Sequence, residues 1–170
     1  MAAGDAFDAA LELLNACQAA LATTPGGAID RAYVSPGLPA FDCCPQITVH
    51  AGGTGEGDTA PLAPPLSPGH RANVQGTVPM LQLTVTVIRC SPVWEENAKQ
   101  PPSPAALQAA AEVTYNDVWA IWSLLRDAKR AETLFAPASR EFFFDPAFPV
   151  LTSGGCAGWQ LPFRVALGGY

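Results

Sequence analysis

The sequence predicts an α+β fold, in which a mostly antiparallel sheet carries two helices packed on one face. Three observations predict it. Two segments place apolar residues at the three- and four-residue spacing of a helix, and several others alternate apolar and polar residues as strands do. The strand-like segments also occur in runs that are interrupted by single helices. At 170 residues the chain fits one domain, so we expect residues 1–170 to form a single unit.

The first predicted helix runs from Asp5 to Ala22. The sequence Thr23-Thr24-Pro25-Gly26-Gly27 ends it, because proline and glycine interrupt helices. Short strands are then predicted at Ile29–Val34 and at Gln46–His50, and the second should be half-buried because its apolar residues alternate with polar ones. One face of the helix should bury an apolar row made of Phe7, Ala10, Leu11, Leu14, Cys17 and Leu21.

The segment from Ala51 to Pro79 differs in kind, since it is rich in glycine and proline and holds few large apolar residues. Such a sequence buries too little surface to offset the entropy of ordering it, which predicts a long mobile loop. Strand-like segments flank it, so we expect the loop to leave a hairpin and return to it. We expect Leu62 and Leu66 within it to contact a neighbouring subunit.

The clearest predicted strand is Met80–Cys90. Leu81, Leu83, Val85 and Val87 alternate with polar residues, which predicts one face on a core and the other on water or a second surface. Two further strands are predicted at Arg140–Asp145 and Trp159–Leu167. The residues between them, Thr152–Gly158, have the composition of turns.

The second predicted helix, Ser103–Ala131, carries more apolar surface than a single core-facing row needs. Ser103 is a good N-cap, and Pro104 suits the first helical position. Beside the first row runs a second one, Tyr115, Trp119 and Trp122, which we expect to pack against the sheet or a neighbouring subunit. The first row, expected on the subunit's own sheet, is Leu107, Ala111, Thr114, Val118, Ile121, Leu125 and Ala128.

The composition argues against nucleic-acid binding. The formal net charge is −6, and charged residues make up only 14% of the chain, whereas phosphate backbones are bound by clustered lysine and arginine. The basic residues that cluster, Arg126, Lys129 and Arg130, are expected to complement the dipole of the second helix. No apolar run approaches the ~20 residues that cross a bilayer, so we expect no membrane association. The N-terminus does not resemble a secretory signal, which predicts an intracellular protein with reduced thiols.

The sequence offers no catalytic, cofactor-binding or metal-binding motif. Cys43-Cys44 with His50 or His70 does not have the paired spacing of zinc ligands. Cys90, a histidine and Glu141 would be the best candidates for an enzyme, but nothing around Cys90 prepares a nucleophile, and a buried structural thiol is the expected role. We therefore expect no enzyme, no cofactor and no metal.

The element order resembles that of the small neck proteins of long-tailed bacteriophages, in particular the tail terminator family of actinobacteriophages. The resemblance rests on the early strand region Arg31-Ala32-Tyr33-Val34, the strand Leu83-Thr84-Val85-Thr86-Val87-Ile88-Arg89-Cys90, the helix begun by Ser103-Pro104, and Gly158-Trp159-Gln160-Leu161. It spans nearly the whole chain. The segment Ala51–Pro79 departs from it, being long for a compact terminator.

The resemblance implies a subunit that forms a homo-oligomeric ring, commonly a hexamer, at the head-proximal end of a tail tube. Its implied partners are the major tail tube protein and the head-connector or stopper protein, and genome DNA would pass through the lumen without specific binding. The implied location is the neck of the virion, with assembly in the host cytoplasm. Another connector or stopper subunit remains an alternative, as does a small cytosolic enzyme or ligand-binding domain.

Overall fold

The fold is α+β, as the sequence predicts. The computed structural model describes residues 3–39, 45–57, 78–93, 100–135, 142–151 and 155–166. Along the chain, the described elements are α1 (Ala3–Leu21), β1 (Ala32–Ser35), β2 (Gln46–Gly57), β3 (Val78–Cys90), α2 (Pro104–Ala131), β4 (Phe142–Phe144), β5 (Phe148–Leu151) and β6 (Cys156–Ala166).

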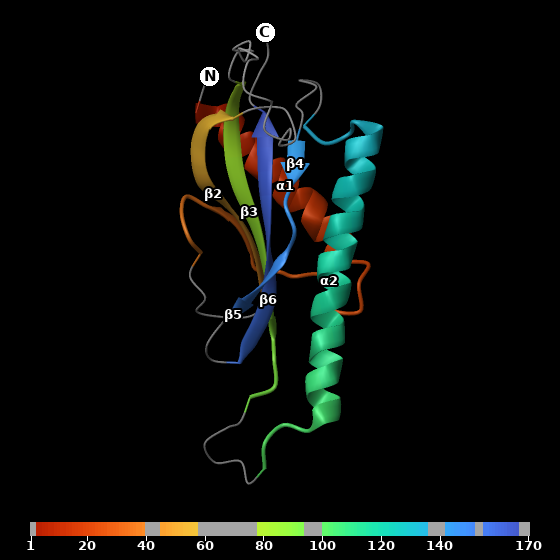
Figure 1. Cartoon of the computed structure of the whole chain (residues 1–170). Helices are drawn as coiled ribbons and strands as arrows, with labels where there is room; N and C mark the ends of the chain where they lie inside the picture. Colours follow the sequence, from red (N-terminus) through yellow and green to blue (C-terminus); the bar gives the residue numbers. More distant parts are fainter. Residues whose placement is uncertain are drawn as a thin grey trace, which may run out of the picture.

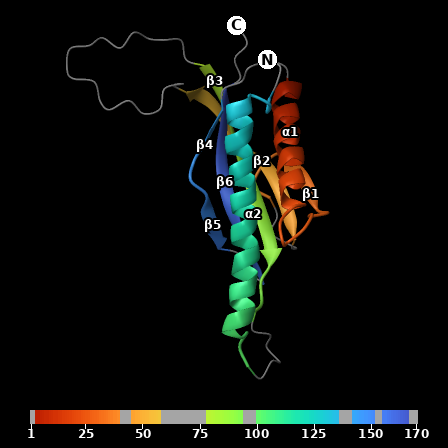
Figure 2. The ribbon, with the colours of Figure 1, turned by 90° about the vertical axis from the view of Figure 1, so that its right-hand side faces the viewer.

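The strands form one six-stranded sheet in the order β1-β2-β3-β6-β4, and β5 also pairs with β6. Among the described strands, β1 and β2 pair in parallel and the other pairs are antiparallel. Both helices cover the same face of this sheet. They lie side by side in Figure 2, and Figure 1 shows that the N-terminal turns of α2 extend past the ends of β5 and β6.

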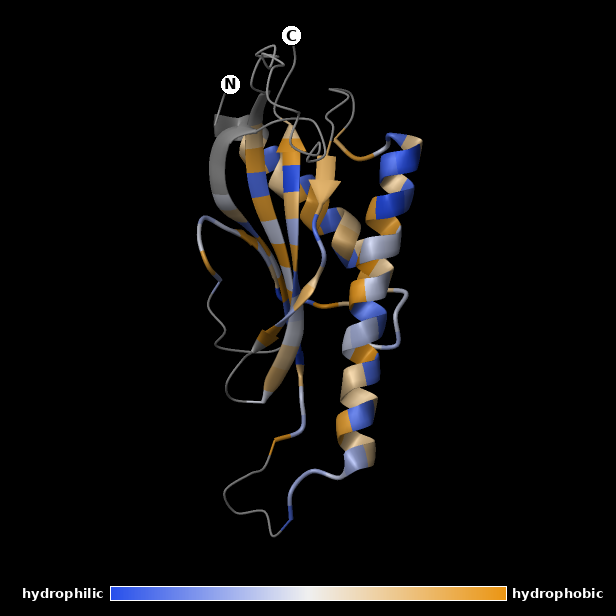
Figure 3. Cartoon of the chain, viewed as in Figure 1, coloured by the Kyte–Doolittle hydropathy of each residue, from blue (hydrophilic) through white to orange (hydrophobic). Residues whose placement is uncertain are grey.

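The core lies between the helices and the sheet face that they cover. Strands β2, β3 and β6 each turn alternate apolar residues toward the helices. Orange bands of apolar residues alternate with paler or blue bands along β3 and β6 in Figure 3. At one end of the core, the rings of Phe135, Phe142 and Phe163 lie 5.1–5.8 Å apart between centroids. The strand residues buried here are Ile47, Val49, Leu81, Leu83, Val85, Val87, Leu161, Phe163 and Val165.

The predicted loop Ala51–Pro79 is wrong at both of its ends. Residues Ala51–Gly57 belong to β2 and pair with β3, with Gly57 opposite Val78 and a register shift between Ala51 and Gly53. Backbone pairing explains this, because ladder hydrogen bonds satisfy the N–H and C=O groups whatever the side chains are. The predicted hairpin itself is confirmed. Leu62 and Leu66 lie outside the described residues.

Three other strand predictions need correction. Strand β1 begins at Ala32 rather than at Ile29, and β5 was not predicted. Gly158, predicted to lie in a turn, is inside β6 opposite Ile88 of β3. An alanine Cβ built at Gly158 would overlap the carbonyl oxygen of Val87, so a glycine is needed there for close approach of the two backbones rather than for a turn.

The buried face of α1 is rotated from the predicted one. Phe7 and Leu11, predicted to be buried, are 54% and 38% exposed. The other four residues of the predicted row, Ala10, Leu14, Cys17 and Leu21, are buried as predicted, and the buried face extends to Ala9 and Leu13.

The predicted core row of α2 is correct only in its C-terminal half. Thr114, Ile121 and Leu125 are buried, but Leu107 and Ala111 are exposed. The reason is positional, since the first turns of α2 have no sheet beneath them (Figure 1).

Candidate subunit interface

Local sequence sets the bounds of α2, the element that carries the candidate interface. Ser103 is the N-cap, and its Oγ accepts a hydrogen bond of 3.2 Å from the backbone N–H of Ala106. The helix ends at a C-cap, Glu132, which adopts a left-handed conformation with φ 52° and donates its backbone N–H to Ala128 O. Both ends are therefore fixed, which holds the aromatic residues between them in place.

Tyr115, Trp119 and Trp122 form the exposed aromatic surface of α2. Tyr115 is 60% exposed and Trp119 is 63% exposed, while Trp122 is half-buried. The rings of Trp119 and Trp122 stack, with centroids 5.4 Å apart and planes inclined by 22°. Burying an exposed aromatic side chain of this size stabilises a complex by on the order of 2 kcal/mol. A partner that covers this surface would therefore bind more tightly.

The sheet supports this aromatic surface from one side. Tyr115 packs on Trp159 of β6 with a centroid distance of 5.2 Å, and Trp122 meets Phe144 of β4 edge-on at 5.8 Å. These contacts orient the two rings from the side of β6 and β4. Trp119, between them along the helix, has its stacked partner on its own helix. The surface is thus rigidly held and still open to a partner.

Basic residues follow the aromatic surface at the C-terminal end of α2, which is blue in Figure 3. The guanidinium of Arg126 lies over the Trp122 ring at 5.2 Å from its centroid. Lys129 Nζ donates a hydrogen bond of 2.8 Å to Phe142 O, which ties α2 to β4. Lys129 and Arg130 occupy the last turn, as predicted from the helix dipole, whereas Arg126 lies before it.

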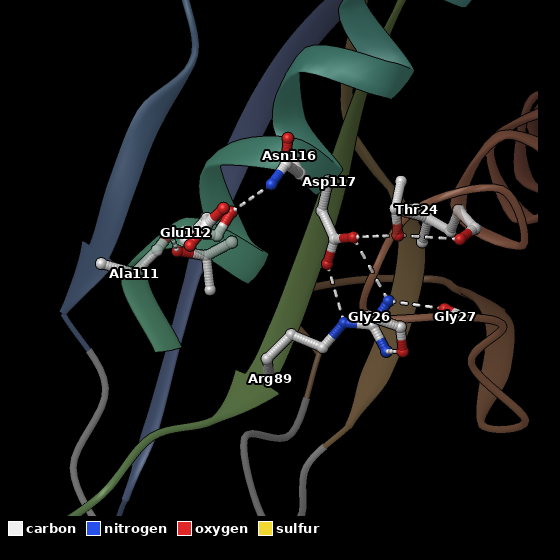
Figure 4. A network of polar contacts seen from close by, with 10 residues as sticks. Thr24, Gly26, Gly27, Arg89, Ala111, Glu112, Asn116 and Asp117 are labelled. Carbon is white, nitrogen blue, oxygen red and sulfur yellow. Dashed lines mark hydrogen bonds and ion pairs between the residues drawn. The ribbon is translucent and has the colours of Figure 1, made fainter. Parts of the chain in front are cut away.

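A buried ion pair, which the sequence did not reveal, anchors α2 to the sheet (Figure 4). Arg89 Nε of β3 donates to Asp117 Oδ2 of α2 at 2.7 Å, and the two side chains are 8% and 1% exposed. Thr24 Oγ1 donates to the other carboxylate oxygen at 2.7 Å. The two terminal nitrogens of Arg89 donate to the carbonyl oxygens of Gly26 and Gly27 at 2.9 and 2.7 Å.

This network joins three parts of the chain that are far apart in sequence. It links the turn after α1, the end of β3 and the middle of α2, and it lies on the opposite edge of α2 from the aromatic surface. A Cβ at Gly26 would lie 2.8 Å from Val113 and 2.9 Å from the Arg89 guanidinium, so no other residue fits without movement. Because the donors and acceptors are paired with one another, we assign the network to holding α2 in place rather than to chemistry.

On the sheet face opposite the helices, the polar residues of the segment Gln46–His50 are buried. The prediction that this strand is half-buried is therefore wrong. Thr48 and Thr86 lie opposite each other in register, and both are 0% exposed. Within the part of the chain that the structure describes, their hydroxyls and the Nδ1 atom of His50 have no hydrogen-bond partner. Burial lowers the pKa of His50 below its usual 6.5, because desolvation disfavours the imidazolium.

We predict that acid destabilises the protein through His50. Its pKa is lower in the folded than in the unfolded state, so the unfolded chain binds the proton first and stability falls as the pH drops below about 6.5. The slope from this one group is at most about 1.4 kcal/mol per pH unit. Urea unfolding between neutral and mildly acidic pH measures it. The His50→Leu variant should lose this slope, and an identical slope in both proteins would contradict the assignment.

Of the enzyme candidates, His50 and Cys90 lie within the described residues, and the structure does not bring these two together. His50 lies opposite Thr84, six residues from Cys90 along β3, which corresponds to about 20 Å. Cys90 is exposed, so the prediction of a buried thiol is wrong for it, whereas Cys17 is buried and burial raises the pKa of its thiol to about 12. Glu141 and the predicted non-ligands Cys43, Cys44 and His70 fall outside the described residues. Among the residues that are described, no three His, Cys, Asp or Glu side chains gather as metal ligands would.

Within the described ranges, neither helix has the length and apolarity that crossing a membrane requires. Among the features described above, the exposed aromatic surface of α2 is the one that packing within the fold does not explain. No protein-family model and no curated protein sequence matches the chain.

Proposed function

We propose that the chain is a structural subunit of a phage neck, a tail terminator that forms a homo-oligomeric ring at the head-proximal end of the tail tube. The observation that carries the proposal is the exposed aromatic surface, above all Trp119, which is 63% exposed. A side chain of this kind, rigid and rich in apolar area, is typical of interface hot spots. The resemblance to tail terminators supplies the kind of assembly.

In this proposal the ring, commonly a hexamer, has two protein partners. One side caps the major tail tube protein and stops its polymerisation, and the other docks onto the head connector or stopper. The net charge of −6 is compatible with DNA passing through the lumen, because acidic surfaces repel phosphate. The function requires no cofactor and no catalytic residue, and it places the protein in the virion neck after assembly in the host cytoplasm.

The Trp119→Ala variant tests the proposal. Because Trp119 is largely exposed, truncation should change the free energy of unfolding of the monomer by less than about 1 kcal/mol, against about 3–5 kcal/mol for a buried tryptophan. Association should weaken by about 2 kcal/mol or more per interface, roughly 30-fold, as for a hot spot. Thermal unfolding and sedimentation velocity measure the two effects separately.

A matched control is Leu38→Ala, since Leu38 is 81% exposed and lies outside α2, between β1 and β2 in the sequence. It should change neither stability nor association. The functional readout is the polymerisation of purified tail tube protein, which wild-type protein should arrest and the Trp119 variant should not. Loss of monomer stability with unchanged association in the Trp119 variant would contradict the proposed role of the aromatic surface.

A further inference from the structure

A second exposed apolar surface lies on α1. It consists of Phe7 and Leu11, which are 54% and 38% exposed and one helical turn apart. Gln18 follows on the same helical row, seven residues after Leu11, and its amide donates to Ile29 O ahead of β1. The α1 surface therefore lies on the side of the helix that faces β1.

The two exposed surfaces lie on opposite sides of the helix layer. The contacts of Tyr115 with Trp159 and of Trp122 with Phe144 place the aromatic surface of α2 on the side of β6 and β4. The α1 surface lies on the side of β1, at the other edge of the sheet. Between them α1 and α2 pack together (Figure 2), and Glu12 of α1 accepts a hydrogen bond from Phe135 N, just after α2.

The charges around the two surfaces are complementary. Helix α1 contains acidic residues and no lysine or arginine, and the exposed Asp8 stands beside Phe7. The aromatic surface of α2 continues into Arg126, which lies over Trp122, and into Arg130, whose side chain is 73% exposed. Asp127 pairs with both at 3.4 and 3.8 Å and neutralises one of the two charges, which leaves this end of α2 net basic. An acidic apolar surface and a basic aromatic surface attract each other, whereas two copies of either surface repel by like charge.

We propose that the aromatic surface of α2 in one copy packs on the Phe7 and Leu11 surface of α1 in the next copy. The partner is a second copy of this chain, and the interface is head-to-tail. Such an interface covers both surfaces in every subunit and closes into a ring when the rotation permits, whereas a two-fold interface between identical surfaces would leave one of them exposed. The inference rests on the proposed function, because it names the contact by which the ring would form.

Two variants and their mixture test the inference. Phe7→Glu removes the α1 surface and keeps α2 intact, and Trp119→Glu does the converse. Each variant alone should be monomeric by native mass spectrometry. An equimolar mixture should give a heterodimer and nothing larger, because only one intact pair of surfaces remains between the two variants. Leu38→Glu, outside both surfaces, should assemble as the wild type does.

The outcomes separate the two proposals. Assembly of Phe7→Glu as in the wild type, or a mixture that stays monomeric while both variants remain folded by circular dichroism, would overturn the head-to-tail contact and leave the ring intact as a proposal. A wild-type chain that never assembles would overturn the proposed function. If either variant unfolds, Asp8→Lys and Arg130→Glu replace them, with weakened assembly expected in each and recovery in the double variant.

Discussion

Replacement of Asp117 by alanine should lower the free energy of unfolding by about 3–5 kcal/mol, as expected when one partner of a buried ion pair is removed. The Arg89 guanidinium would keep its place in the interior without the carboxylate that neutralises it. The Thr24 hydroxyl would also lose its acceptor at 2.7 Å. This loss is a large part of the ~5–15 kcal/mol that holds a typical domain folded.

Urea unfolding measures the effect, with Asp127→Ala as the matched control. Asp127 lies on the same helix and pairs with Arg126 at 3.4 Å, but its side chain is 61% exposed. An exposed pair of this kind contributes about 0–1 kcal/mol, so the control should remain close to wild type. Equal effects of the two substitutions would contradict a special role for the buried pair.

A double variant separates the uncompensated charge from lost packing. Replacing both partners with apolar residues, as Arg89→Met with Asp117→Leu, leaves no buried charge behind. The double variant should therefore be more stable than Asp117→Ala alone. If it is less stable than Asp117→Ala, packing and not charge governs this part of the fold.

Replacement of Gly158 by alanine should destabilise the fold by about 3 kcal/mol, the upper part of the range for overpacking. The added Cβ would overlap Val87 O and lie 2.9 Å from Ile88 Cα, and backbone atoms cannot turn aside as a side chain can. Strands β3 and β6 are central neighbours in the sheet, so separating them would disturb pairing over their whole length.

Gly52→Ala is the matched control for Gly158. A Cβ at Gly52 would meet Gln82 Cβ at 3.7 Å, an ordinary van der Waals distance, and its backbone is not left-handed. Alanine there should be neutral or stabilise by about 0.4–1 kcal/mol by restricting the unfolded chain. Thermal unfolding of the two variants compares them directly, and similar stabilities would show that β3 and β6 can separate at little cost.

The spacing of apolar residues predicted those elements in which one face is clearly more apolar than the other. The alternation of Leu81, Leu83 and Val85 predicted β3, and the cap at Ser103 predicted the start of α2. The same method failed where two assignments of a face were equally periodic. Phe7 and Leu11 flank the same helical face as Leu14, which is buried, and only the tertiary packing of α1 decides that this face extends toward Leu13 rather than toward Leu11.

Long-range partners left no signal in the sequence. Arg89 and Asp117 are 28 residues apart, and neither stands in a motif, so their pairing depends on how α2 crosses β3. Gly158 was misassigned because glycine is common in turns and the close backbone approach depends on the neighbouring strand. For the candidate interface, the sequence did identify Tyr115, Trp119 and Trp122, since a second apolar row on a helix exceeds what one core needs. The exposed α1 surface was missed.

In the proposed ring, the exposed aromatic surface of α2 is a contact between copies of this chain. The native mass of the wild-type protein, alone and with purified tail tubes, tests it most directly. We expect a closed assembly of one discrete mass, commonly six subunits in the family that the sequence resembles, and its loss in Trp119→Glu. A protein that stays monomeric under both conditions would contradict the claim.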